Sequence, residues 1–270
     1  MKQRILVAVV GVPLLLLLFI AAPAWATLAL VCLVSAVGCY ELLRAVGGAA
    51  WKSCAFLVAF AAATPAVLGT GASGLRTGAW VLLAVVLTFL TGVLCYGRPG
   101  RQIPFAAMMA GLFGALAIPM AFTGLYFLRN MENGRALVLL PLCCAFGSDT
   151  LALFAGMLFG RHKLAPHVSP KKTVEGSLGG FLGSILLVWL LYGIAGLFCD
   201  LELSMGKIVL LGLLGSFMGQ LGDLSFSVIK REFGVKDYGN LLPGHGGVLD
   251  RFDSVAFVTP VVWLAVSLFG

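Results

Sequence analysis

The chain has 270 residues, of which 60% are hydrophobic and only 11% are charged, and its formal net charge is +7. A mean hydropathy of +1.05 excludes a water-soluble globular domain. The composition instead predicts an all-α polytopic membrane protein, in which excess basic residues mark orientation in the bilayer and give no support to nucleic-acid binding.

Apolar runs of about 20 residues are long enough to cross the hydrocarbon core of a bilayer. Nine runs approach this length, at about residues 5–22, 24–43, 54–69, 79–96, 104–127, 137–159, 176–198, 208–229 and 250–269. They cover most of the chain, which predicts a single integral-membrane domain over residues 1–270. The first run, with Lys2 and Arg4 before it and Ala24-Trp25-Ala26 after it, also fits a cleavable signal peptide, although a polytopic chain needs no removable signal.

The basic residues are unevenly divided between the two sides of such a nine-span chain. Fourteen of the 18 lysines and arginines fall on the side of the N-terminus, and the other side holds four, namely Arg76, Arg129, Arg135 and Lys207. The positive-inside rule therefore places the N-terminus and the loops around residues 160–176 and 230–250 in the cytoplasm. Nucleoside triphosphates are found on that side, while any single basic residue there is also explained as an orientation signal or a lipid-headgroup contact.

The eighth run contains a stripe of small and polar residues. Gly215, Gly219, Asp223 and Ser227 recur at a spacing of four, and Arg231 continues the row. Residues four apart share a helix face. The glycine half of the stripe is typical of a helix-packing seam, whereas the half around Asp223 needs another explanation.

Acidic residues at membrane depth are costly, by about 2.5–3.5 kcal/mol on insertion scales, and usually face a partner or a cavity. Asp149 lies midway along the sixth run and Asp250 at the start of the ninth. A purely structural alternative is open for Asp223, which could pair with Lys230 or Arg231 as an inert salt bridge, and a structural role is open for Asp149 as well.

Two cytoplasmic loops add the features of a phosphate site. Lys171 and Lys172 can neutralise phosphate charge, and glycines at 244, 246 and 247 allow backbone N–H groups to approach phosphate oxygens. Mg²⁺ typically binds one or two carboxylates together with substrate phosphates. Together with the intramembrane acids, these loops indicate metal-assisted phosphate chemistry at the membrane surface. Asp253 has a simpler interpretation as a helix cap or a partner of Arg251.

The polar segments near the end of the chain resemble a known signature. Its elements are Ser227-x-x-Lys230-Arg231, Lys236-Asp237, PGHGG at Pro243–Gly247, Asp250-Arg251-x-Asp253, GDL at Gly222–Leu224 and SPKKTVEG at Ser169–Gly176. These motifs are similar to those of the phosphatidate cytidylyltransferases (CDP-diacylglycerol synthases), in particular the bacterial type. The resemblance extends over about residues 137–270, a catalytic transmembrane core, and is loose over the N-terminal helices at 1–136.

The resemblance implies a reaction in which CTP and phosphatidate give CDP-diacylglycerol and pyrophosphate. It also implies a homodimer in the bacterial plasma membrane, with a polar cavity open to the cytoplasm. Asp223 and Asp250, with Asp149 as a further candidate, would hold Mg²⁺, alongside a monovalent cation such as K⁺, and Lys171 and Lys172 would act in catalysis. The implied substrate-binding residues are Ser169, Thr173, Glu175, Ser227, Lys230, Arg231, Lys236, Asp237, His245, Gly246, Gly247, Arg251 and Asp253.

The sequence departs from the family pattern at two places. Many relatives have a more polar, tyrosine-containing segment where Leu151-Ala152-Leu153 stands, which weakens a specific role for Asp149. Many also have a glutamate where Phe226 stands, so no role of that carboxylate transfers to this chain.

Two other functions fit part of the pattern. A CTP-dependent lipid kinase of the polyprenol type would also use a nucleotide at a membrane, and a phosphate or cation transporter would also have intramembrane aspartates. The complete signature disfavours both, and the absence of visible internal repeats weakly disfavours a transporter. CDP-alcohol phosphotransferases are excluded because their helix motif is absent.

Overall fold

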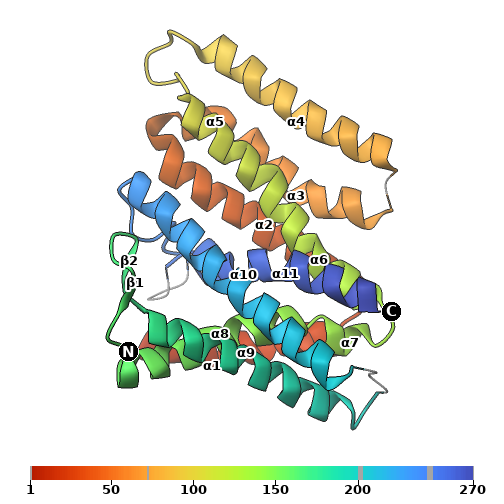
Figure 1. Cartoon of the computed structure of the whole chain (residues 1–270). Coiled ribbons are helices and arrows are strands. Elements are labelled where there is room, and N and C mark those ends of the chain that lie inside the picture. The colour runs from red at the N-terminus through yellow and green to blue at the C-terminus, as the bar shows by residue number, and fades with distance from the viewer. Residues whose placement is uncertain (1, 72, 200–202, 242–245, 270) are drawn as a thin grey trace. The chain divides into compact units, whose positions relative to one another are not determined.

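The computed structural model describes residues 2–71, 73–199, 203–241 and 246–269 and consists almost entirely of helices (Figure 1). Two compact units make up the chain. Unit 1 comprises residues 1–126 and 233–251, and unit 2 comprises residues 127–232 and 252–270. Among the described residues, eight helices are long and apolar enough to cross a membrane.

Unit 1 is built from the N-terminal helices. Its elements are α1 (Lys2–Ile20), α2 (Ala24–Gly47), the 3₁₀ helix η1 (Gly48–Cys54), α3 (Phe56–Gly69), α4 (Gly74–Cys95), α5 (Phe105–Leu112), the π-helical turn η2 (Phe113–Ala117) and most of α6 (Ile118–Asn130). Gly111 of α5 lies against α2 and α3, since a Cβ built there would be 2.7 Å from Leu57 and 3.0 Å from Leu43. Small residues thus allow close helix packing in this unit.

Unit 2 contains the C-terminal helices and a hairpin. Its elements are α7 (Gly134–Leu137), α8 (Leu140–Phe159), β1 (Lys163–Ala165), β2 (Ser169–Thr173), α9 (Val174–Ala195), α10 (Met205–Glu232) and most of α11 (Leu249–Phe269). The helices α8 and α9 approach so closely that a Cβ on Gly147 would lie 2.6 Å from the carbonyl oxygen of Gly183. Because β1 and β2 connect these two helices directly, the hairpin lies at one end of the pair.

The predicted glycine seam of α10 is confirmed. A Cβ on Gly215 would meet Cys144 of α8 at 2.5 Å, and one on Gly219 would meet Val258 of α11 at 3.3 Å. One further turn along, Gly222 faces the backbone oxygen of Asp253. The seam therefore holds α10 against both α8 and α11 within unit 2.

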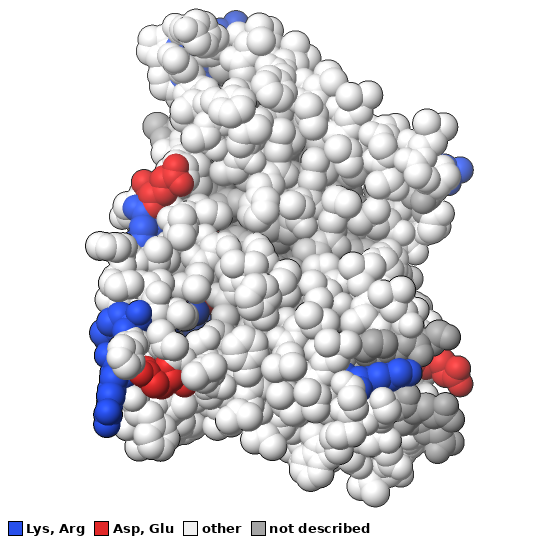
Figure 2. Space-filling view, in the orientation of Figure 1, with Lys and Arg blue, Asp and Glu red and all other residues white. Residues whose placement is uncertain are grey.

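Most of the expected spans coincide with the observed helices. The short third run is lengthened by η1, so that residues 50–69 reach spanning length. The first run falls in α1, whose described apolar stretch, Gly11–Ile20, is shorter than a span, so a ninth crossing stays a prediction. On the face drawn in Figure 2, the surface of unit 2 is largely uncharged, and its charged side chains gather near the two ends of its helices. This distribution suits a membrane protein.

The hairpin is the one described departure from the expected all-α fold. Its strands pair antiparallel, with Lys163 opposite Thr173 and Ala165 opposite Ser169. The Val168 amide donates to the Ala165 carbonyl at 3.2 Å and closes the turn. These strands are hard to recognise in the sequence, because segments of three and five residues without alternating hydrophobicity predict only a loop.

Candidate functional site

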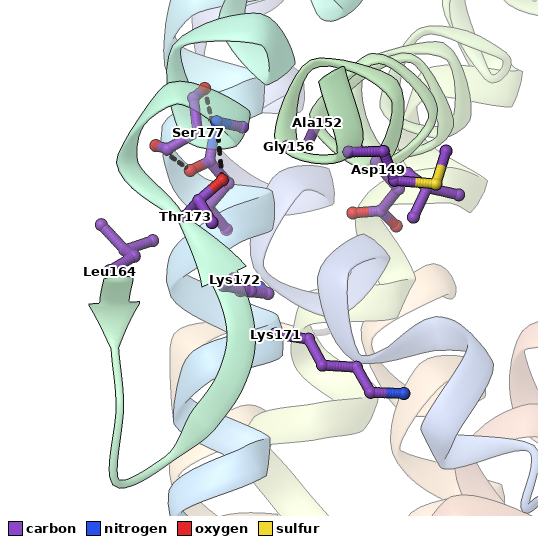
Figure 3. Close-up of a pocket in the computed structure, with 12 residues that line it drawn as sticks. Asp149, Ala152, Gly156, Leu164, Lys171, Lys172, Thr173 and Ser177 are labelled. Atoms are coloured by element: carbon purple, nitrogen blue, oxygen red, sulfur yellow. Dashed lines mark hydrogen bonds between the residues drawn. The ribbon is translucent and has the colours of Figure 1, made fainter. Parts of the chain in front are cut away.

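A cavity of about 450 Å³ lies in unit 2 between α8, the hairpin, α9 and α10 (Figure 3). One part of its wall is apolar and consists of Ala152, Leu153, Met157 and Leu164. The polar part of the wall consists of Asp149, Lys171, Lys172, Thr173, Ser177 and Gln220. The cavity thus combines an apolar surface with cationic and acidic groups. Ala152 and Leu153, which depart from the family pattern, contribute to the apolar part.

Lys172 and Asp223 form an ion pair across unit 2. Lys172 is in β2 and Asp223 is midway along α10, and about a quarter of each side chain is exposed, 25% and 29% respectively. The sequence analysis left open a structural pairing of Asp223 with Lys230 or Arg231. The structure shows it paired with Lys172, a lysine of the predicted phosphate-binding loop.

The polar residues of the α10 stripe lie on one face of the helix, as predicted. The Ser227 hydroxyl donates to Asp223 Oδ1 at 3.5 Å, and Arg231 Nε donates to the carbonyl of Val168 in the hairpin at 3.3 Å. The Lys172 ion pair and the Arg231 contact thus attach the hairpin to the C-terminal half of α10. Lys172 is therefore held beside the acidic stripe.

Acidic side chains gather around this ion pair. Asp253 of α11 is only 7% exposed and interacts electrostatically with Asp223, Asp149 and Lys230. Its Oδ1 also accepts a hydrogen bond of 2.7 Å from the amide of Ser254. A buried carboxylate usually needs hydrogen-bond donors or cations as partners, here the Ser254 amide and Lys230, which is itself 8% exposed. Asp253 therefore belongs to the acidic cluster, a role beyond the cap or Arg251 partner considered from the sequence.

A buried hydrogen-bond network underlies the cavity and escaped the sequence analysis. Gln220 accepts a short hydrogen bond from the Ser177 hydroxyl, and its amide donates to the Ser177 carbonyl at 3.2 Å and to Ser216 Oγ at 3.0 Å. The hydroxyls of Ser216 and Ser148 are 2.9 Å apart. Uncharged polar residues in apolar runs are common, so only their spacing of four on α10 could have indicated this network.

The remaining predicted residues of the hairpin segment have local structural contacts. Thr173 caps α9 by accepting from the amide of Gly176 at 3.1 Å. The Glu175 carboxylate accepts from the amide of Arg161 at 3.1 Å and lies 2.6 Å from His162 Nδ1, outside the cavity wall. Ser169 is half-buried at the start of β2. These contacts order the segment that carries Lys171 and Lys172.

Asp250 lies in unit 1 and organises the connection between α10 and α11. Its Oδ2 accepts hydrogen bonds from the amides of Tyr238, at 2.8 Å, and Gly247, at 2.9 Å. Gly246 has a φ of +82°, and a Cβ there would be 3.0 Å from the same oxygen, so only glycine fits without strain. Asp250 and Gly247, two residues of the signature, are thus in direct contact.

The other predicted residues lie in this connection or, in the case of Arg251, in the first turn of α11. Lys236, Asp237 and Arg251 are exposed, whereas His245, together with Pro243 and Gly244, lies outside the described residues.

The donor chemistry of unit 2 suits a hard cation. Asp149, Asp223 and Asp253 offer carboxylate oxygens, which Mg²⁺ prefers. Over residues 2–71, 73–199, 203–241 and 246–269, no group of three His, Cys, Asp or Glu residues forms a ready-made metal cage. Mg²⁺ itself typically takes one or two carboxylates and completes its shell with water and substrate phosphates.

Comparison with known proteins identifies the family. The sequence profile of the cytidylyltransferase family matches residues 2–269. The chain belongs to this family. The resemblance noted in the signature is thereby confirmed at the family level, and the cytidylyltransferase match also includes the N-terminal helices, where the sequence analysis found only a loose likeness.

Named relatives are similar to part of this chain. The phosphatidate cytidylyltransferase of Staphylococcus epidermidis is 43% identical over 146 residues, which cover 53% of this chain and 55% of that protein. That of Bacillus subtilis is 40% identical over 157 residues, covering 58% and 57%, respectively. That of Staphylococcus aureus is 40% identical over 147 residues, covering 53% and 55%. The chain thus spans about half the length of the curated relatives it matches.

Proposed function

We propose that the protein is a phosphatidate cytidylyltransferase, which converts CTP and phosphatidate into CDP-diacylglycerol and pyrophosphate. The observation that carries this proposal is the two-sided cavity of unit 2, with Lys171 and Lys172 on one part of its wall and Leu153 and Met157 on another. An amphipathic substrate with a phosphate head and acyl tails matches such a wall. The names of the relatives support the same reaction.

The chemistry needs positioning and charge neutralisation more than proton transfer. Phosphatidate is a phosphate monoester with a second pKa of roughly 6, so its oxygen is already an anionic nucleophile at neutral pH. Two highly anionic substrates must meet, and fixed cations lower the cost of that encounter. Lys171 and Lys172 would neutralise the triphosphate, and Lys230, Arg231 and Arg251 are further cations for either phosphate. No general base is required, so His245 is proposed as a phosphate or loop hydrogen-bonding residue.

We propose Mg²⁺ as the cofactor, with K⁺ as an additional cation. Asp223 and Asp149 of unit 2 would hold Mg²⁺, whereas Asp250 of unit 1 is proposed as a metal ligand from the family resemblance alone. When bound, Mg²⁺ would neutralise negative charge on the phosphate oxygens. The chain's own part is to keep Asp223 beside Lys172, a cation of the cavity wall.

The proposed setting is the plasma membrane of a bacterium, with the site open to the cytoplasm and the protein acting as a homodimer. The eight apolar helices support an integral membrane location. The excess of basic residues on one side supports the orientation, because cytoplasmic loops attract lysine and arginine.

The experiment follows the phosphorus of CTP. Attack on the α-phosphorus transfers label from α-labelled CTP to the lipid and leaves γ-label in pyrophosphate, whereas a lipid kinase transfers γ-label. Purified protein with Mg²⁺ and phosphatidate is expected to give organic-soluble counts from the α-label alone. Transfer of γ-label would overturn the assignment in favour of the kinase. The absence of transfer from both labels would favour the transporter.

A further inference from the structure

Glu41 is a buried acid in α2 of unit 1, and its side chain binds the start of α11. It is only 3% exposed, and its Oε1 and Oε2 accept hydrogen bonds from the amides of Val248, at 3.0 Å, and Leu249, at 2.8 Å. Leu249 is the first residue of α11 and Val248 directly precedes it, and N–H groups at the start of a helix have no partner within the helix. A residue about 207 positions earlier in the chain thus caps this helix.

Glycines in the α10–α11 connection (residues 233–248) make room for the Glu41 side chain. A Cβ on Gly247 would be 2.5 Å from Oε2, and one on Gly239 would be 2.7 Å from Oε1 and 3.0 Å from Cδ of Glu41. Gly239 does not have a positive φ, so its backbone would accept alanine, and the three atoms nearest to a new Cβ all belong to the Glu41 side chain. The carboxylate is therefore enclosed by the connection from two sides.

Asp250 completes the same arrangement. Its Oδ2 binds the amides of Tyr238 and Gly247, while Glu41 binds the next two amides, those of Val248 and Leu249. Consecutive backbone donors from 247 to 249 are thus held by two carboxylates within unit 1. Loss of either acid would leave buried N–H groups unsatisfied, at a cost of about 1–3 kcal/mol each.

From this geometry we infer that Glu41 is a positioning residue for Asp250 and the glycine turn of the α10–α11 connection. It acts through the backbone of residues 247–249 and is not proposed to touch either substrate. This inference rests on the proposed function for its catalytic consequence, whereas its structural part can be measured without any substrate.

The test compares Glu41→Gln and Gly239→Ala with the wild-type protein. Glutamine at position 41 keeps one of the two acceptor oxygens. Alanine at position 239 is expected to displace the Glu41 carboxylate, because its Cβ would lie 2.7 Å from Oε1. Amide hydrogen exchange over residues 246–250 should become faster in both variants. Turnover per folded protein should fall about 10-fold or more, as for loss of residues that orient ligands indirectly, with little change in the KM for phosphatidate. Matched controls are Glu132→Gln, an exposed acid, and Gly78→Ala, where a Cβ has open space.

A double variant separates positioning from general damage. Glu41→Ala removes the Cγ, Cδ and Oε1 atoms that the new Cβ at position 239 would meet. Glu41→Ala with Gly239→Ala should therefore be no worse than Glu41→Ala alone, because contacting residues give non-additive effects. Full additivity would overturn the inference. So would unchanged exchange in Glu41→Gln, or faster exchange with normal turnover of the folded protein.

Failure of the inference about Glu41 can be distinguished from failure of the proposed function. If wild-type protein transfers no label from CTP, the proposed function fails, and faster exchange at residues 246–250 still supports the role of Glu41 in holding that turn. If wild-type protein is active and Glu41→Gln is indistinguishable from it in both measurements, the inference about Glu41 alone fails.

Discussion

The ammonium group of Lys172 pairs with the carboxylate of Asp223, which joins strand β2 to the middle of α10 within unit 2. A carboxylate at this depth needs a partner, and a lysine beside a phosphate-binding cavity needs to be held in place. One contact meets both needs. It also raises the question of whether Asp223 serves the reaction or only neutralises Lys172.

Neutralising Asp223 tests these two roles. Asp223→Asn should lower turnover by at least about 100-fold, the scale of losing one charge-stabilising group, with little change in thermal stability. The double variant Asp223→Asn with Lys172→Met removes the unpaired cation and should remain inactive. Recovery of turnover in the double variant would show that Asp223 only balances the charge of Lys172. Exposed Lys163→Met in the same hairpin serves as the control.

Two substitutions of Asp250 should distinguish its role in organising the loop from its proposed role in metal binding. Asn at this position keeps one oxygen that can accept from the amides of Tyr238 and Gly247, whereas Ala keeps none. Asp250→Asn should therefore fold normally and lose turnover, and Asp250→Ala should in addition lose thermal stability by about 1–3 kcal/mol. Thermal unfolding in detergent and label transfer from α-labelled CTP measure the two effects. Equal activity of Asp250→Asn and wild type would refute a metal-binding role.

The close approach of α8 and α9 predicts a stability difference between two glycines of α9. A Cβ on Gly183 would lie 2.7 Å from the Cβ of Leu151 and 2.9 Å from the carbonyl carbon of Gly147, while one on Gly193 has no neighbour within 4 Å. Gly183→Ala should destabilise the protein by about 1–3 kcal/mol through overpacking. Gly193→Ala should be neutral or stabilising, because alanine favours helices. Similar unfolding temperatures for the two variants would contradict this packing.

Sequence reasoning was most successful where one residue spacing carries the information. The spacing of four from Gly215 to Ser227 indicated one face of α10, and the structure shows its glycines packed and Ser227 bonded to Asp223. Runs of apolar residues likewise located the helices, because the bilayer sets their length.

Residue spacing did not reveal contacts between residues that are far apart in the sequence. Nothing local indicates that Glu41 meets residues 248 and 249, or that Lys172 meets Asp223. Glu41 does lie within an apolar run, so the argument applied to Asp149 could have marked it as a residue that needs a partner. Identifying that partner required the fold.

The positions of the connections relative to the membrane provide the last prediction. The helices α9 and α10 are each long enough to cross, so the hairpin and the α10–α11 connection should lie on one side and the α9–α10 connection on the other. In a background without the seven native cysteines, cysteine at exposed Pro166 or Asn240 should react with an impermeant thiol reagent only after spheroplasts are opened. Cysteine at exposed Ser204 should react in intact spheroplasts. The physical reason is that the side with the hairpin and the α10–α11 connection carries the excess of lysine and arginine, and loops rich in these residues stay in the cytoplasm. Labelling of position 240 from outside would reverse this orientation and would deny cytoplasmic CTP access to residues 233–248.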